Sequence, residues 1–468
     1  MFASPPSRAR LRLARPALFR LSDQAANRLR AAPEQHAGRR AAGKHFYEAM
    51  MKKLWAVVCL ALLFPAAAAA QELPGRREIS WGHLALAPGL AVQEVYDDNI
   101  YYGSGSNRTS ELKEGDWINH VKPALLLDYS LEERGRVQLG YEGDFARYGH
   151  NSFNDWRTHR GLLDIDYRAP GGLIVKIKNT LTDAEDPYGS LNEYGLGRKT
   201  MRWLNDFAGT AGFAFSDRFK VLTFYNCFKQ RYADREDFTQ NYTAAEAGAG
   251  GEAKVADKTW LFLRSYAGQQ KYDTHRAGVT GSNDASYGWK RVNAGLAWDS
   301  EARFEGEVNA GYQWNSFDNS HDKNAVSYKD ESSWIAATSV DFRQSDTRTI
   351  RLDFSRNLRQ LSGGQNGYFM STGAGLGLSQ QINRRMLLLA GYAYTKNKYT
   401  SSYDSYSGRK DGIHAARASL NYMLADWLCV GLGYIRLKDS SNNSRDSYTV
   451  NRVSISLDMN PAFSGRRP

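Results

Sequence analysis

The sequence has few cysteines and no long apolar segment. Three cysteines occur in 468 residues, and Cys227 and Cys429 lie far apart in segments that we expect to be strands. No disulfide framework or paired-cysteine metal motif is present, so two free thiols are favoured over a bridge. The longest apolar run, Trp55 to Phe64, is too short to span a bilayer comfortably as a helix. These absences exclude a disulfide-stabilised scaffold and a helical membrane protein.

Recognisable catalytic and metal-binding motifs are also missing. The chain has no G-x-S-x-G elbow, no P-loop and no H-E-x-x-H motif. His150, Asp155 and His159 flank one loop, where polar residues in water are the favoured interpretation over catalysis. Asp97-Asp98-Asn99 and residues 318–323 offer oxygen ligands for calcium without a full calcium-loop spacing, so solvated loops are favoured there too. We expect no catalytic residue, no metal and no cofactor.

The positive charge belongs to the first part of the chain. The formal net charge is +11, but residues 1–70 hold 12 Lys and Arg against 3 Asp and Glu, a net of +9. The rest of the chain therefore carries only +2. Because the basic segment is expected to be removed, the basic pI does not indicate a nucleic-acid partner.

A secretory signal is expected at residues 51–70. Met51-Lys52-Lys53 is basic, the apolar run follows, and a run of alanines ends at Ala70, where cleavage is expected. Residues 1–50 show no domain pattern and are interpreted as an upstream extension from a wrongly chosen start, or as disordered. Residues 71–82 would form a periplasmic N-terminal segment.

From residue 83 to residue 468 the chain repeats one pattern. Segments of about ten residues alternate apolar and polar side chains, and short turns alternate with long loops rich in Asp, Asn, Ser, Gly and Tyr. Eight short turns and nine long loops predict 18 strands, with 16 as the alternative. This predicts an all-β fold: a transmembrane, up-and-down, antiparallel β-barrel with both ends in the periplasm.

One hairpin tests this interpretation by its register. If Ala169 pairs with Leu173, Ile165 faces Ile177 on one side of the sheet, and the acids Asp164 and Asp166 face Lys178 and Lys176 on the other. Opposite charges across a strand pair stabilise by about 0.2–1 kcal/mol. A slip of one residue would place these charges in lipid, at roughly 2–4 kcal/mol for each lysine near the midplane.

The polar face of the strands supplies the candidate functional residues. We expect them to line a water-filled lumen, with acidic and basic walls opposed across it and no assignable preference for anions or cations. The candidate pore-lining residues are Glu142, Asp144, Asp164, Asp166, Lys176, Lys178, Arg291, Glu305, Glu307, Arg351, Asp353 and Arg417.

Tyr and Trp are concentrated at the strand ends. Girdles at the membrane interface are the favoured interpretation, and stacking on sugar rings inside the barrel is the alternative, because an apolar ring face suits a pyranose. The residues concerned are Tyr96, Tyr101, Tyr102, Trp117, Tyr148, Trp156, Trp203, Trp289, Trp298, Trp314 and Trp334.

The opening of the first expected strand carries a resemblance. Val95-Tyr96-Asp97-Asp98-Asn99-Ile100-Tyr101, preceded by residues 84–90, resembles the start of the β-barrel porin 2 family. This resemblance implies an outer-membrane barrel associated with exopolysaccharide systems, and the family supplies no catalytic residues. Phe463 resembles the terminal aromatic residue of barrel-assembly signals.

Three functional hypotheses follow for a barrel of this size. The leading one is a pore, because barrels of 16–18 strands leave an aqueous channel; it would serve polysaccharide export or small polar solutes. The second is a structural or adhesive barrel whose lumen is closed and whose loops bind surface polymer. The third and least favoured is an outer-membrane hydrolase. The expected partners are outer-membrane lipid and, during biogenesis, the barrel-assembly machinery.

Overall fold

The computed structural model describes most of the chain after residue 78. The described residues are 79–105, 113–190, 198–234, 237, 240–273, 285–298, 303–320, 328, 330–360, 368–399, 408–443 and 446–459. The expected signal peptide, the segment before it and Phe463 lie outside them. No helix among the described residues is long and apolar enough to cross a membrane.

The described chain is almost entirely β-strand. Two short 3-10 turns, Glu132–Arg134 and Ser152–Asn154, interrupt the pattern. The strands are β1 (Ile79–Trp81), β2 (Leu84–Asp97), β3 (Asp116–Ser130), β4 (Gly135–Tyr148), β5 (Trp156–Arg168), β6 (Leu173–Asp186), β7 (Thr200–Ser216), β8 (Phe219–Tyr232), β9 (Tyr242–Ala256), β10 (Thr259–Tyr272), β11 (Tyr287–Trp298), β12 (Phe304–Phe317), β13 (Glu331–Ser345), β14 (Arg348–Gln360), β15 (Tyr368–Asn383), β16 (Met386–Tyr399), β17 (Lys410–Ala425), β18 (Leu428–Ser441) and β19 (Tyr448–Met459).

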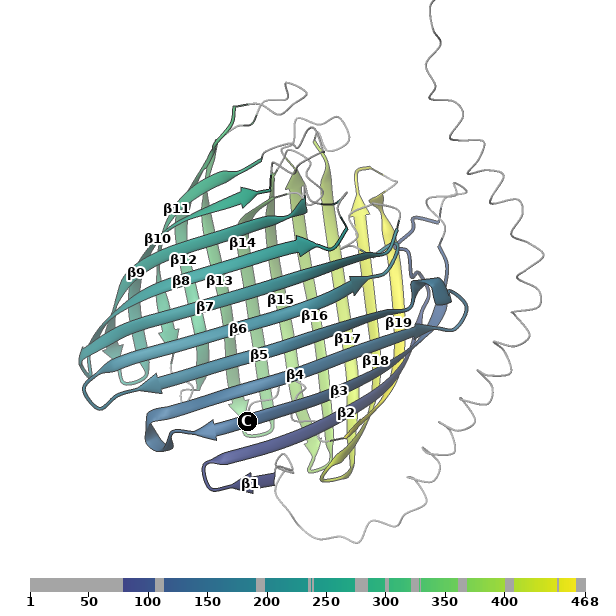
Figure 1. The fold of residues 1–468 in the computed structure, drawn as a ribbon, viewed down its shortest axis with the longest axis horizontal. Helices are drawn as coiled ribbons and strands as arrows, with labels where there is room; N and C mark the ends of the chain where they lie inside the picture. The colour runs from purple at the N-terminus through teal and green to yellow at the C-terminus, as the bar shows by residue number, and fades with distance from the viewer. Residues whose placement is uncertain are drawn as a thin grey trace, which may run out of the picture. The chain divides into compact units, whose positions relative to one another are not determined.

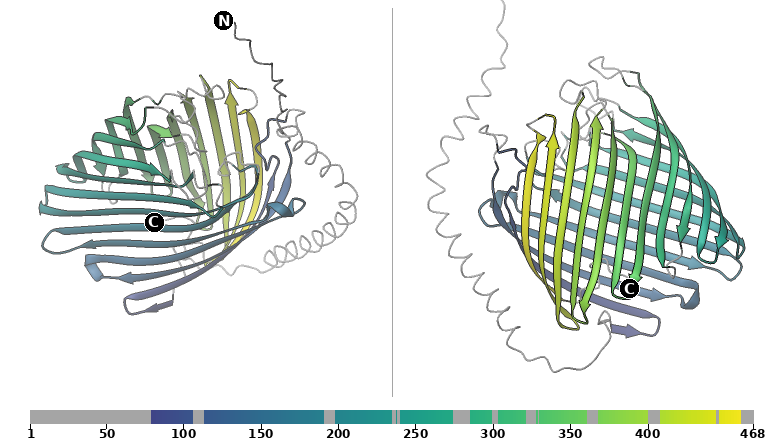
Figure 2. Two further views of the ribbon diagram at one scale, coloured as in Figure 1. Left: turned by 45° about the horizontal axis from the view of Figure 1, so that its top comes forward. Right: turned by 180° about the vertical axis from the view of Figure 1, so that it is seen from behind.

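The sheet closes on itself. Each strand from β2 onward pairs antiparallel with the next, and β19 returns to pair with β2 from Arg452↔Asp97 to Met459↔Leu90. The three-residue β1 adds only to β2, so the barrel proper has 18 strands, β2 to β19. Figure 1 shows the strands inclined across the barrel, and the right view of Figure 2 shows the green and yellow strands of the other side. The predicted strand number is confirmed.

Short and long connections alternate around the barrel as expected. The eight connections at one end are 2 to 5 residues long, from the two-residue turn after β7 to residues 299–303 after β11. The nine at the other end have 6 to 18 residues. Because short turns are periplasmic and long loops extracellular in such barrels, the long-loop end faces outward from the cell.

The predicted hairpin register is the observed one. The backbone N–H of Ala169 donates to the Leu173 carbonyl at 2.9 Å. Ile165 pairs with Ile177, Asp166 with Lys176 and Asp164 with Lys178. The lysine Nζ atoms lie 3.4 Å from the Asp166 carboxylate and 3.6 Å from that of Asp164.

The acidic motif after β2 holds the closing seam of the barrel and is not a solvated loop. Asp97 accepts a hydrogen bond from Nε of Arg452 on β19 at 2.7 Å. Asp98 accepts from the backbone N–H and side-chain amide of Asn451, at 2.7 and 2.8 Å. Asn99, fully buried, donates to the carbonyl of Thr449. These bonds join the first and last strands of the barrel at its long-loop end.

Candidate functional site: the inner face of the barrel

The strand register divides the side chains between two faces. One face carries exposed apolar residues at paired positions, such as Leu139, Leu352, Leu376 and Leu432. On the other face, side chains reach past a neighbouring strand to the strand beyond it: Arg264 of β10 contacts β12. Side chains converge in this way only on the concave side of a closed sheet, so the second face is the inner one.

All twelve sequence-predicted candidates occupy inner positions of this register. Four acids on β4 and β5 and two lysines on β6 form one group on adjacent strands. Arg291 on β11, two glutamates on β12, a pair on β14 and Arg417 on β17 complete the set. The pairings that place them are Glu142↔Arg160, Asp144↔Thr158, Asp164↔Lys178, Asp166↔Lys176, Tyr266↔Arg291, Glu305↔Asp341, Glu307↔Ser339, Asp341↔Arg351, Ser339↔Asp353 and Gly391↔Arg417.

The acids of β4 bind cations on the strands beside them. Glu142 accepts a hydrogen bond from Nη1 of Arg160 on β5 at 3.2 Å. Asp144 lies 2.9 Å from Nδ1 of His120 on β3 and 3.8 Å from the Lys122 ammonium. With the two Asp–Lys pairs of β5 and β6, these contacts make a wall of alternating charge. The expectation of opposed acidic and basic walls is wrong here, because neighbouring strands neutralise each other locally.

A second charged network lies on β8 to β12. Arg264 donates to Glu252 of β9 at 2.7 Å and to Glu307 of β12 at 2.9 Å. Arg291 of β11 reaches past β10 to Glu246 of β9 at 2.6 Å. Both guanidinium groups also lie over aromatic rings, Arg264 being 3.8 Å from the Phe262 centroid. Lys220 of β8 lies 2.8 Å from Glu252, so the network connects five consecutive strands on their inner side.

Aromatic residues also form part of this inner wall: Trp289 is one of the residues for which an inward position was the alternative, whereas Tyr266 was not predicted from the sequence. Tyr266 lies against Gly248, where a Cβ atom would be 2.4 Å from Cδ1 of the ring. Trp289 packs against Gly268 in the same way, also at 2.4 Å. Small residues on one strand thus make room for rings of the next. The Gly- and Ala-rich segment 242–255, weak as a strand by its apolar pattern, was the available signal.

The wall formed by β12 to β16 is built from small polar residues and is more open. A hollow of 460 Å³ is lined by Glu307, Ser339, Asp353 and Thr395 among others. Arg351 donates to Ser339 at 2.7 Å and to Asp353. Arg417 is exposed and forms no ion pair with a described residue. This part of the inner face presents charge to open space.

The charged side chains of the inner face remain accessible to water. The exposed fraction of the side chain is 49% for Arg351, 46% for Asp353 and 66% for Lys178. A packed core would bury such groups almost completely. The described inner wall is therefore wet at these positions.

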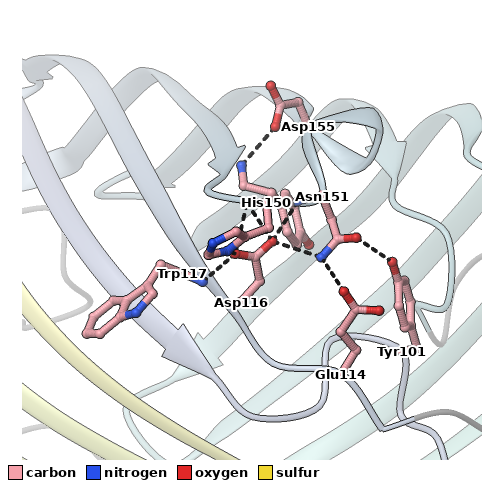
Figure 3. Close-up of polar contacts among 8 residues, drawn as sticks. Tyr101, Glu114, Asp116, Trp117, His150, Asn151 and Asp155 are labelled. Atoms are coloured by element: carbon pink, nitrogen blue, oxygen red, sulfur yellow. Dashed lines mark hydrogen bonds and ion pairs between the residues drawn. The ribbon is translucent and has the colours of Figure 1, made fainter. Parts of the chain in front are cut away.

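A polar network around the buried residues Asp116 and Asn151 lies at the long-loop end of β3 (Figure 3). Asp116 accepts hydrogen bonds from the backbone N–H of Asn151 at 2.8 Å and of Trp117 at 2.8 Å, and lies 3.0 Å from Nδ1 of His150. Asn151 also donates to Glu114 and accepts from the Tyr101 hydroxyl at 3.1 Å. Burial and the nearby Glu114 and Asp116 carboxylates raise the pKa of Tyr101. The network anchors the β2–β3 loop to the β4–β5 loop.

The loop histidines and acid do not converge on one site. Asp155 accepts a hydrogen bond from the backbone N–H of Tyr148 at 2.8 Å. His159 lies on the outer face, where its Nδ1 is 2.8 Å from the hydroxyl of Tyr141, while His150 belongs to the Asp116 network. Among the described residues no group of three His, Cys, Asp or Glu could hold a metal ion. Neither Cys227 nor Cys429 forms a disulfide bond.

The aromatic residues at the strand ends divide between the two faces. Those on the outer face fit an interfacial girdle, whereas those on the inner face pack on inner-face neighbours: Tyr148 is buried beside Ile118, and Trp289 donates to Glu246. The outer positions are Tyr96, Trp117, Trp203, Trp298, Trp314 and Trp334, and the inner ones are Tyr148, Trp156 and Trp289.

A closed antiparallel barrel of 18 strands, apolar outside and polar inside, is the architecture of an outer-membrane porin or channel-like protein. The family model described as putative beta-barrel porin 2 matches residues 78–460, and the chain belongs to that family. The family and the fold place the protein in the outer membrane.

Solved structures with a similar fold are distant in sequence. The FrpB iron transporter from Neisseria meningitidis is 10% identical, with 80% of this chain and 81% of that chain covered and a TM-score of 0.45. A BenF-like porin from Pseudomonas fluorescens Pf-5 is 9% identical, covering 80% and 98%, with a TM-score of 0.42. The outer membrane protein opdK from Pseudomonas aeruginosa is 13% identical, covering 80% and 98%, with a TM-score of 0.40. No curated protein matches the chain.

Proposed function

We propose that this protein is a passive channel through the outer membrane, lined by the inner charged residues. One observation carries the proposal: the side chains of Lys178, Arg351 and Asp353 point into the barrel and remain 46% to 66% exposed although each forms an ion pair. A wall of this kind is stable against water, because charged groups are costly to bury in an apolar interior. Barrels of 16–18 strands are wide enough to hold such water.

Permeation would depend on this wall and on no chemical step. Solutes would exchange bulk water for contact with alternating acids and bases, so the wall would pass polar solutes of either charge. The twelve candidate residues would act as the pore lining. The porin family and the barrel of a channel fit a protein that is not an enzyme.

Single-channel recording tests the proposal directly. The mature protein, refolded in detergent and added to a planar bilayer, should give discrete current steps that scale with salt concentration. A folded protein that shows no current would contradict the channel and favour the adhesive barrel with a closed lumen. The folded state is checked independently by its heat-modifiable electrophoretic mobility.

Within this function, we propose that the transported solute includes saccharide polymer in an export system. The support is the aromatic inner wall, where Tyr266 and Trp289 pack against Gly248 and Gly268 beside charged groups. Flat ring faces bind the apolar faces of pyranoses, and adjacent charges bind their hydroxyls. Oligosaccharides should therefore block the ion current transiently, and Trp289→Ala should shorten each block. Blocks of equal duration in the wild type and in Trp289→Ala would contradict the saccharide assignment without contradicting the proposal that the protein is a channel.

A further inference from the structure

The outer face of β16 to β18 carries a cluster of basic residues near the long-loop end. The register aligns Lys398 of β16 with Lys410 of β17, and His414 of β17 with Lys438 of β18. Lys396 precedes Lys398 on the same face, as Arg436 precedes Lys438. We refer to these residues as the basic patch: Lys396, Lys398, Lys410, Arg436 and Lys438.

All five cations are exposed, and none forms an ion pair with a carboxylate of the described residues. The acids of the same strands, Asp411 and Asp439, take alternate positions and lie on the inner face, buried. The patch therefore concentrates positive charge that the described part of the outer face does not compensate.

Three basic residues elsewhere on the outer face at the same end are paired. Arg157 of β5 lies 3.3 Å from Glu185 of β6, and Arg147 of β4 lies 3.7 Å from Asp155. Lys271 of β10 forms an ion pair with Asp318. Lys229 of β8 and Lys290 of β11 have no carboxylate partner among the described residues but stand singly, so the basic patch differs from the rest of the described rim in its clustering of cations.

The patch lies at the level where lipid headgroups meet the barrel. Tyr394 and Tyr392 precede Lys396 on the outer face of β16, and Tyr434 precedes Arg436 on β18. Exposed Leu432 lies further down the same strand. Tyrosine marks the interface of transmembrane barrels and leucine the hydrocarbon. The cations immediately beyond the tyrosines are therefore within reach of headgroup phosphates in the outer leaflet.

We propose that the basic patch binds a glycolipid of the outer leaflet that carries two phosphate groups. Three adjacent strands spaced about 4.8 Å apart spread the five cations over roughly 10 Å across the barrel. A single phosphate occupies only part of this width, whereas two phosphates on a sugar scaffold occupy it fully. The strands involved lie side by side in the right view of Figure 2. The site is independent of whether the channel conducts.

Native mass spectrometry of the purified full-length barrel tests the lipid site. Bisphosphorylated lipid A, its monophosphorylated form and phosphatidylglycerol are titrated separately as probes. We expect a one-to-one complex that is tightest with bisphosphorylated lipid A. In Lys396→Ala/Lys398→Ala/Lys438→Ala, binding should weaken about fivefold per lysine, on the order of 100-fold together, because each basic residue near an anionic surface contributes about that factor.

Two further variants make the result decisive. Arg147→Ala/Arg157→Ala/Lys271→Ala removes three paired cations from the same rim and should bind lipid as the wild type does. Lys396→Arg/Lys398→Arg/Lys438→Arg should retain tight binding. The proposed site would be contradicted if the triple alanine variant of the basic patch bound lipid A as tightly as the wild type. It would also be contradicted if the rim control lost as much affinity as that variant. Equal affinity for phosphatidylglycerol would overturn the assignment to a glycolipid with two phosphates.

Discussion

Arg264 of β10 extends past β11 to bind Glu307 of β12, with 2.9 Å between Nη1 and Oε2. Its other terminal nitrogen donates to Glu252 of β9 at 2.7 Å, so one guanidinium joins three strands, β9, β10 and β12. The side chain of Arg264 is 16% exposed and that of Glu252 only 4%. Such a contact exists only because the sheet is curved and closed, and it relates the lining of the lumen to the stability of the barrel.

Replacement of Arg264 should therefore destabilise the fold. Arg264→Met leaves Glu252 buried with only Lys220 as partner, and breaking a buried pair costs about 3–5 kcal/mol. Arg343→Met breaks the more exposed pair with Glu305 and should cost less than about 1 kcal/mol. Equilibrium urea unfolding in lipid vesicles, followed by tryptophan fluorescence, measures both. Similar losses in the two variants would contradict the role assigned to the network.

Charge reversal in the β5–β6 hairpin should change ion selectivity. Lys178→Glu replaces an accessible inner cation by an anion opposite Asp164, so the reversal potential in a salt gradient should shift toward cations. The exchange variant Asp164→Lys/Lys178→Asp restores the pair and should return selectivity close to that of the wild type. The same shift in both variants would show that the pair does not act as a unit.

Inner-face glycines should differ in their tolerance of alanine. A Cβ at Gly248 would lie 2.4 Å from the Tyr266 ring and 2.6 Å from the Ser265 carbonyl, so Gly248→Ala should destabilise by about 1–3 kcal/mol. A Cβ at Gly375 would lie 3.6 Å from the nearest atom, which is an ordinary contact. Gly375→Ala should therefore leave the free energy of unfolding unchanged or raise it slightly. The same urea experiment compares them. Equal behaviour of the two variants would contradict the packing of rings on glycine.

The closing seam should weaken in acid. Burial alone would raise the pKa of Asp98, but hydrogen bonds from Asn451 and the Lys113 ammonium outweigh it and hold the pKa below the ordinary 3.8. The seam's stabilisation is thus complete above pH 3.8 and is lost as pH falls through the lower folded value. Asp98→Asn should be less stable than the wild type at pH 7, and the difference should narrow below pH 3.8. Unfolding rates followed by heat-modifiable mobility measure this, and a gap that is constant with pH would contradict it.

The architecture could be predicted from the sequence because it depends on local patterns. Alternation of apolar and polar residues follows from the two faces of a strand, and turn and loop residues mark where strands end. The register at Asp164–Lys178 was also predictable, because a slip of one residue would move the charged side chains to the lipid face and because the hairpin turn fixes the pairing. The inner position of the twelve charged candidates follows from the same period of two.

The partners of these residues required the closed sheet. The alternation of side chains along each strand predicts that Arg264 and Glu307 share a face. Only the curvature of the sheet brings the side chains of β10 and β12 close enough to contact each other on that face. The same holds for Asp97 and Arg452, which are 355 residues apart and meet because β19 closes on β2. Asp97-Asp98-Asn99 therefore looked like a solvated loop until closure supplied its partners. In this protein the sequence alone determined strands, faces and register, whereas closure of the barrel decided which charges meet, which stay wet and which face the membrane unpaired.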